Sequence, residues 1–137
     1  MCFIKIIDFT YSRHYITKVL DEDVIVIKVL YRKSVNRIFF KKYTYYSPCQ
    51  NYKYIKNKLN TSPLSICIAK MLSEQKCRII INEGFHSFCT KWDAYKTDLV
   101  KDPRAVLCKC IIPKGSTVSS NGSEIVSNQI IFIEELK

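Results

Sequence analysis

Tyrosines and lysines are interleaved between residues 41 and 58, and together they could bind an anionic compound that carries aromatic rings. Tyrosine rings stack on nucleobases while lysine ammonium groups meet phosphates, so this combination suits nucleotides or single strands of nucleic acid. The same pattern fits an edge strand whose tyrosines pack on a sheet and whose lysines keep that edge from pairing. On the first interpretation the contacts are Lys41, Lys42, Tyr45, Tyr52, Lys53 and Tyr54.

A second candidate is the Glu-Gly-Phe-His-Ser-Phe motif at 83–88. In a strand, His86 and Ser87 point to opposite faces, and the backbone can approach a ligand closely at Gly84. A histidine and a serine at such a place could contact a ribose or a phosphate. The alternative is that His86 is a structural residue whose hydrogen bonds are satisfied inside the protein.

The seven cysteines do not form a recognisable framework. Their number is odd and no Cys-x-x-Cys pair occurs, which indicates free thiols in a reducing cell. A zinc site with His86 or His14 lacks any supporting spacing, so we expect no metal. Cys2 could act as a nucleophile with its own amine as base if Met1 were removed, or it could be a small buried residue at the start of a strand.

Common enzyme signatures are missing from the chain. It contains no Walker loop, no Gly-x-Gly-x-x-Gly, no Gly-x-Ser-x-Gly and no His-Glu-x-x-His. Two histidines among 137 residues leave little room for a catalytic triad. We therefore favour binding over catalysis, without excluding an enzyme.

The basic charge is concentrated in one stretch. The formal net charge is +10, and no acidic residue occurs between Val24 and Ser73. The ten basic residues of that stretch equal the net charge of the whole chain. A surface of one sign attracts anions, so we expect nucleotides, nucleic acid or an anionic surface as partners, unless the stretch is only a solvated basic face.

Short strands are expected on both sides of the candidate residues. Alternation predicts a strand at 3–7, and a β-branched run predicts a central strand at 23–31 with Lys28 as its one internal charge. Residues 37–46 could form an edge strand or an extended loop. Further strands are predicted at 78–82, 105–112 and 129–133, with a hairpin turn around Asn121 and Gly122.

Two helices are expected between these strands. Ser62 and Pro63 resemble a helix start, and the apolar spacing predicts a helix to about residue 75 that buries Leu64, Ile68, Met71 and Leu72. A capping-box pattern at 90–93 predicts a second helix that carries Trp92, Tyr95 and Leu99 inward. We therefore expect a single α+β domain over 1–137, with two main helices and a mixed or mainly antiparallel sheet. No apolar run approaches the roughly 20 residues that cross a bilayer, so we expect a cytoplasmic protein with no membrane partner.

Several motifs in order resemble a family of small uncharacterised proteins from phages, large DNA viruses and their hosts. The most specific are the motif at 83–88 and Cys-Ile-Ile-Pro-Lys-Gly-Ser at 110–116. The resemblance covers most of the chain except residues 31–46 and 60–78. It implies a viral or phage accessory protein, located in the host cytosol if the chain is viral.

The same landmarks more weakly resemble the ADP-ribosyltransferase fold. On that resemblance Lys28 takes the place of the first motif's Arg or His, Ser87 that of the first serine, and Glu124 that of the catalytic glutamate. Phe88 and Cys89 stand where the family has a Thr-Ser pair, and no Glu-x-Glu or Gln-x-Glu precedes the last strand. These departures favour a fold that binds a nucleotide over one that transfers ADP-ribose.

The first functional expectation is a protein that sequesters a small nucleotide, ADP-ribose-like or cyclic, and so counters a host defence signal. Its contacts would be Lys28, Arg32, His86, Ser87 and Lys114, and a homo-oligomer could enclose the ligand between subunits. The second is a divergent ADP-ribosyltransferase or NAD-cleaving enzyme, with NAD as substrate and Glu124 as its catalytic residue. The third is an RNA- or DNA-binding protein that uses the Tyr/Lys-rich segment.

Overall fold

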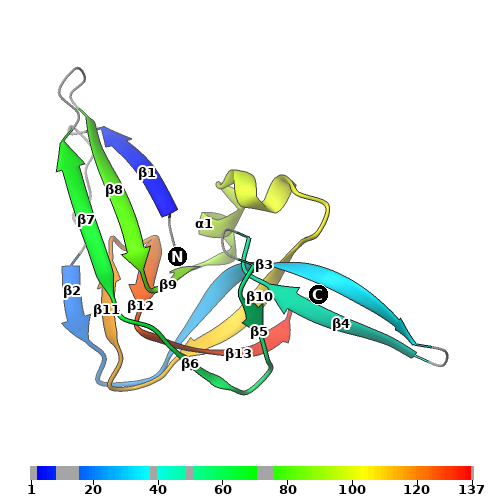
Figure 1. Ribbon diagram of the computed structural model, residues 1–137. Coiled ribbons are helices and arrows are strands. Elements are labelled where there is room, and N and C mark those ends of the chain that lie inside the picture. The colour runs from blue at the N-terminus through cyan, green and yellow to red at the C-terminus, as the bar shows by residue number, and fades with distance from the viewer. Residues whose placement is uncertain (1–2, 9–15, 38–39, 49–50, 71–75, 137) are drawn as a thin grey trace.

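The computed structural model describes residues 3–8, 16–37, 40–48, 51–70 and 76–136. This part of the chain is mainly β, with a ten-stranded antiparallel open sheet, a smaller three-stranded sheet, one short α-helix and one 3-10 helix (Figure 1). The expected α+β fold with two main helices is therefore wrong, and the ADP-ribosyltransferase-like arrangement that belonged to the same expectation is corrected with it.

The large sheet has an order of strands that differs from their order in the chain. Eight strands follow one another as β2-β11-β12-β9-β3-β10-β13-β6, while β4 pairs with β3 and β5 pairs with β4. Their bounds are β2 Ile16–Val19, β3 Val24–Arg37, β4 Phe40–Tyr46, β5 Lys53–Tyr54, β6 Leu59–Thr61, β9 Phe85–Phe88, β10 Ala105–Ile112, β11 Thr117–Ser120, β12 Glu124–Ser127 and β13 Gln129–Glu135.

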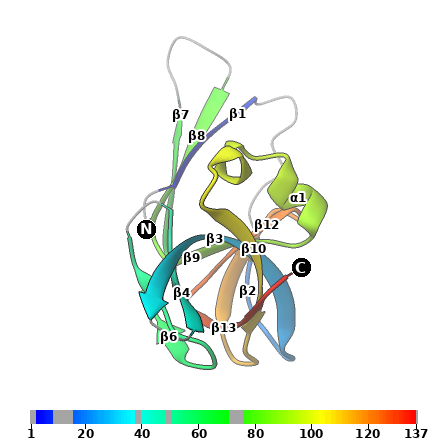
Figure 2. The same ribbon diagram turned by 90° about the vertical axis from the view of Figure 1, so that its right-hand side faces the viewer.

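The three-stranded sheet has the order β1-β8-β7, with β1 at Phe3–Asp8, β7 at Ser65–Lys70 and β8 at Lys76–Glu83. It extends away from the large sheet in both views (Figures 1 and 2). Gly84 joins β8 to β9 with a φ of +124°, so the chain passes from the small sheet to the large one at a single glycine.

The predicted central strand is β3, which pairs with β10 from Val24↔Ile112 to Tyr31↔Ala105. Successive side chains of a strand point to opposite faces, so this β-branched run packs on both sides. Val26 and Leu30 belong to one hydrophobic core, and Ile27 and Val29 belong to another.

The large sheet is curled (Figure 2), and the larger core lies on one of its faces. It combines side chains from β3, β5 and β9 to β13. The smaller core lies on the other face, between Phe88 of β9 and Ala94 of the helix α1, Lys91–Tyr95. The 3-10 helix η2, Asp98–Lys101, follows α1 and contributes Leu99 to this core.

The capping box at Thr90 is confirmed, because Asp93 N donates to the Thr90 hydroxyl and Thr90 N donates to the Asp93 carboxylate. The inward face of the helix was predicted wrongly. Trp92 is 77% exposed and Tyr95 is 56% exposed, while Ala94 is fully buried. A helix of only five residues covers the sheet with one side chain, so the large aromatic residues remain outside.

The helix expected from Ser62 to about residue 75 is wrong. Residues Ser65–Lys70 form β7, which pairs with β8 from Ser65↔Glu83 to Lys70↔Cys77. The expected core positions Met71 and Leu72 lie outside the described residues. The β-branched Ile66 and Ile68 at alternate positions suit a strand, and hydrogen bonds to a partner strand outweigh the local helix-start signal.

The strands expected at 3–7, 23–31, 78–82, 105–112 and 129–133 are confirmed as β1, β3, β8, β10 and β13. The segment 37–46, for which a strand or a loop was expected, contains β4. The hairpin around Asn121 and Gly122 is also confirmed, as the connection between β11 and β12. None of the helices in the described part of the chain has the length and hydropathy of a membrane-spanning segment.

Candidate functional site

The outer halves of β3 and β4 form a two-stranded arm that projects from the sheet (Figure 1). Its register runs from Tyr31↔Tyr46 to Arg37↔Phe40. β5 pairs with β4 only at Tyr45↔Tyr54 and Tyr46↔Lys53, so within the described residues the rest of this edge of β4 has no partner strand. A long unpaired edge is open to another molecule unless its side chains prevent pairing.

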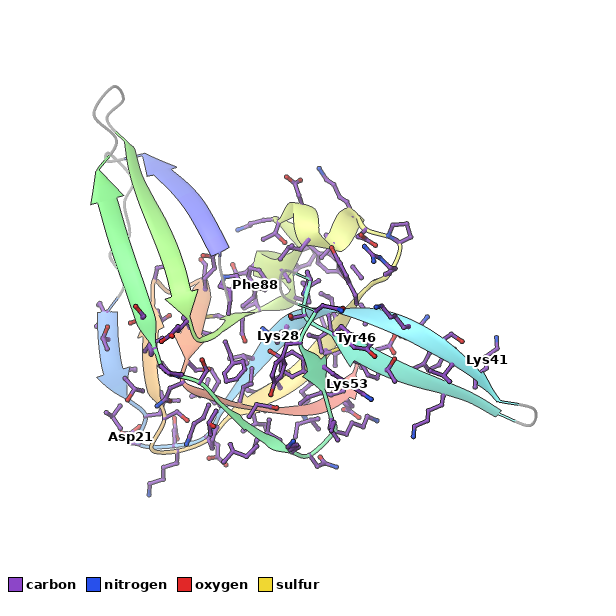
Figure 3. The ribbon with its side chains drawn as sticks, viewed as in Figure 1. Asp21, Lys28, Lys41, Tyr46, Lys53 and Phe88 are labelled. Carbon is purple, nitrogen blue, oxygen red and sulfur yellow. The ribbon has the colours of Figure 1, made fainter. Side chains whose placement is uncertain are left out.

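A groove of about 690 Å³ lies along this edge, between the arm and the body of the protein. Four of its lining residues are lysines, four are aromatic, and none is acidic. The lining consists of Val35, Lys41, Lys42, Tyr43, Thr44, Tyr45, Lys53, Tyr54, Ile55, Lys56 and Phe132. Lys41 is near the far end of the arm and Lys53 lies on the body, so the lysines are spread along the groove (Figure 3).

The aromatic residues give the groove a buried end and an open side. Tyr54 and Phe132 belong to the large core, and the Tyr45 ring packs edge-on against Phe132 with a centroid distance of 4.9 Å. Tyr43 is 37% exposed, and the guanidinium carbon of Arg32 lies 4.4 Å from its ring centroid. One face of the Tyr43 ring is therefore covered by a cation.

Glu135 fixes the base of the arm to the body. Its carboxylate accepts a hydrogen bond from Arg32 Nη1 at 2.8 Å and another from the Tyr45 hydroxyl at 2.9 Å. Burial, followed by the nearby Glu135 carboxylate, raises the pKa of Tyr45 from 10.0 to about 12. The tyrosine is thus kept as a hydrogen-bond donor. Glu135 of β13 therefore holds both strands of the arm, β3 through Arg32 and β4 through Tyr45.

Lys28, expected as a ligand contact, points into the large core and is only 2% exposed. Its ammonium donates to the backbone oxygen of His86 at 2.5 Å and lies 5.5 Å from the centroid of the Tyr54 ring. Ser87 is also fully buried. These two side chains are inside the protein and contribute no surface to the groove.

His86 and Glu124 lie on the other face of the sheet, where His86 Nε2 is 3.7 Å from Glu124 Oε2. The His86 ring packs edge-on against Phe88 at 4.8 Å. Glu124 lines a second pocket, of about 520 Å³, beside α1, and Asp93 and Asp98 line it too. Glu124, the catalytic residue of the enzyme alternative, is therefore found in a pocket with three carboxylates, apart from the basic groove.

Lys114 is exposed in the turn between β10 and β11, where its backbone N–H donates to Asp23. Arg32 lies at the opposite end of the β3–β10 pair. Eight residues of strand separate position 24 from position 32, a length of about 26 Å. The five contacts expected for a small nucleotide are thus distributed over the interior and two faces, and the structure does not bring them together.

Five of the six residues expected to bind nucleic acid do come together, since Lys41, Lys42, Tyr45, Lys53 and Tyr54 all line the groove. Tyr52 lies beside it, with its ring 5.0 Å from that of Tyr54, and its hydroxyl donates to Asn60. The predicted contacts omitted six residues that also line the groove, namely Val35, Tyr43, Thr44, Ile55, Lys56 and Phe132. Ile55 could have been included because it is adjacent to Tyr54 in the chain, but no local signal identifies Phe132.

The remaining candidates in the described part of the chain are cysteine thiols and metal-binding side chains. Cys89, Cys108 and Cys110 are free thiols, and burial raises the pKa of Cys110 to about 12. No group of three or more His, Cys, Asp or Glu side chains in this part of the chain could hold a metal ion. Cys2 and His14 lie outside the described residues. No protein-family model, curated protein or solved structure matches the chain.

Proposed function

We propose that the protein binds nucleic acid in the groove between its β3–β4 arm and its body. The observation that carries this proposal is the lining of the groove, with four lysines, four aromatic residues and no acidic residue. Lysine ammonium groups neutralise phosphates and release their counterions, which supplies most of the affinity of a sequence-independent nucleic-acid binder.

An extended ligand suits the groove better than a single nucleotide. The lysines occur on β4, on β5 and on the segment after β5, rather than converging on one point. A polyanion can contact all of them in turn, whereas one nucleotide offers its phosphates at one end only. The carboxylate of Glu135, which contacts the groove residue Tyr45, is occupied by Arg32 and Tyr45.

Protection of the edge of β4 is the competing explanation for the lysines. It accounts for Lys41 and Lys42, which lie on the unpaired part of that edge. It does not account for Lys53 and Lys56, which lie on β5 and on the segment after it, or for exposed apolar side chains such as Ile55 among the lysines. Lysines and apolar side chains at these positions would not help to keep the edge of β4 from pairing with another strand.

The test is fluorescence anisotropy with labelled oligonucleotides of increasing length at several NaCl concentrations. Four phosphate contacts predict a slope of log affinity against log salt of about −3 for single strands, and each Lys→Gln change should reduce its magnitude by roughly 0.7. Affinity should increase with strand length until the groove is filled.

Lys114→Gln is the matched control, because it removes the same charge from an exposed lysine outside the groove. Lys41→Gln and Lys53→Gln should weaken binding clearly more than this control. Equal losses in all three variants would mean that only the net charge matters, and the groove would not be the binding site. Tight binding of a mononucleotide without dependence on length would favour a nucleotide pocket instead.

A further inference from the structure

The apolar side chains of the groove point to the kind of nucleic acid that it holds. Three of the large hydrophobic residues that remain exposed in the protein line it, namely Val35 at 41%, Tyr43 at 37% and Ile55 at 51%. Apolar surface left in water is unfavourable unless a partner covers it. Phosphates cannot do so, but the flat faces of nucleobases can.

We infer that the groove binds single-stranded nucleic acid, RNA or DNA, with a base stacked on Tyr43, an inference that rests on the proposed function. In a duplex the bases are paired and stacked on one another, and only their edges are open in the grooves. A side chain inside a groove of about 690 Å³ can reach a base face only when the strand is unpaired.

The surroundings of Tyr43 prepare its ring for stacking. The Arg32 guanidinium covers one face at 4.4 Å, and Arg32 is itself held by Glu135 at 2.8 Å. The ring is therefore restrained before a ligand arrives, which lowers the entropy lost on binding. A base on the other face would complete a stack of guanidinium, tyrosine and base, with lysines of the same groove facing the phosphates.

Tyr46 provides a matched control on the same strand. It lies three residues from Tyr43, on the opposite face of β4, outside the groove lining, and its ring is covered by the Lys33 ammonium at 4.5 Å. Tyr46→Leu thus removes an aromatic ring and a cation–π contact from the arm without altering the groove. Tyr43→Phe keeps a ring at the stacking position.

The experiment compares the affinities of a homopyrimidine single strand and of a duplex of equal length for the full chain and these variants. Tyr43→Leu should weaken single-strand binding about five- to 150-fold, as for the loss of one stacked base, with the salt slope unchanged. Tyr43→Phe and Tyr46→Leu should bind the single strand nearly as the unmodified protein does. The duplex should bind more weakly and be insensitive to Tyr43→Leu.

Two outcomes would overturn this inference while leaving the proposed function intact. One is lysine-dependent binding of the duplex as tightly as the single strand, and the other is an equal effect of Tyr43→Leu and Tyr46→Leu. If neither nucleic acid binds with the salt dependence expected for the groove lysines, the proposed function itself fails. Thermal melting of each variant identifies any that loses affinity through unfolding, and Tyr43→Phe then decides whether the ring is needed.

Discussion

Glu135 illustrates how one carboxylate can organise a basic site without lining it. It accepts hydrogen bonds from Arg32 and from the Tyr45 hydroxyl, and these two residues face each other across β3 and β4. Hydrogen bonds to charged groups stabilise a fold more than hydrogen bonds between neutral groups, so these two bonds to Glu135 should restrain the arm. The price is one positive charge withdrawn from the ligand, since Arg32 is already paired.

Tyr45 should make the stability of the protein sensitive to alkaline pH. The folded protein holds the hydroxyl proton up to a pKa of about 12, whereas the ordinary value is 10.0. Its contribution to the free energy of unfolding is therefore complete below pH 10.0 and is lost as the pH rises towards 12. In urea titrations over this range, Tyr45→Phe should show a shallower loss of stability than the unmodified protein.

Glu135→Gln tests the part of the raised Tyr45 pKa that comes from the Glu135 carboxylate rather than from burial. It removes the charge that disfavours tyrosinate but keeps an oxygen that can accept the hydrogen bond, so the alkaline loss should end at a lower pH. Part of the loss should persist in both variants, because burial also raises the pKa of Tyr54. Identical profiles for Tyr45→Phe and the unmodified protein would show that Tyr45 does not titrate as described.

The sequence allowed part of the site to be predicted at this scale. Lys41, Lys42, Tyr45, Lys53 and Tyr54 are close in the chain, so their local pattern was sufficient. The small-nucleotide site failed to assemble because its residues come from distant strands, and a pattern of residue types does not say which face each strand presents. Lys28 was recognised as the one charge in a central strand, yet nothing local shows that its ammonium reaches the His86 carbonyl.

At the scale of elements, periodicity predicted strands well and helices poorly. The β-branched run that became β3 has few alternatives to a strand. Residues 62–75 carried helix-start and helix-spacing signals, but the Ser65–Lys70 segment pairs with β8, a strand that begins six residues later. Local propensity is a weak guide where a partner strand can supply a full set of hydrogen bonds.

The link between the two sheets at Gly84 should be intolerant of any side chain. Its φ of +124° is rarely adopted by other residues, and an added Cβ would lie 2.7 Å from Val126 Cγ1 and 3.3 Å from the Ser127 carbonyl oxygen. Backbone strain and overpacking together predict a loss of roughly 3–5 kcal/mol for Gly84→Ala, measured by urea denaturation.

Gly115 is the control for the backbone part of this cost. Its φ is +87°, but a Cβ there would meet nothing within 4 Å. Gly115→Ala should therefore cost only the conformational strain, roughly 1–2 kcal/mol. Equal losses in the two variants would indicate that the close approach of β12 to Gly84 has no energetic consequence.

At the scale of the whole molecule, the charge that suits the groove for nucleic acid should also destabilise the free protein. The net charge of +10 is concentrated in the acid-free segment that includes the arm and the groove lysines. Like charges repel one another over about 10 Å at 0.1 M salt and over longer distances in more dilute buffer. An anionic ligand would relieve this repulsion as well as make its own contacts.

Salt should therefore have opposite effects on stability and on binding. Between low and moderate NaCl concentrations, the melting temperature of the free protein should rise because the repulsion is screened. Over the same range, affinity for a single strand should fall because each counterion released from the strand gains less entropy in a more concentrated salt solution. The double variant Lys41→Gln/Lys42→Gln should melt at a higher temperature than the unmodified protein at low salt, and the difference should shrink as salt is added. Lys101→Gln removes one positive charge too, but that lysine is paired with Asp98 at 2.7 Å, so its loss should raise the melting temperature less or not at all.

A melting temperature that does not change with salt, or a double variant that is no more stable than Lys101→Gln, would mean that repulsion between the clustered lysines does not destabilise the fold. The acid-free segment would then be well solvated in the free protein, and relief of repulsion would contribute nothing to the binding of nucleic acid.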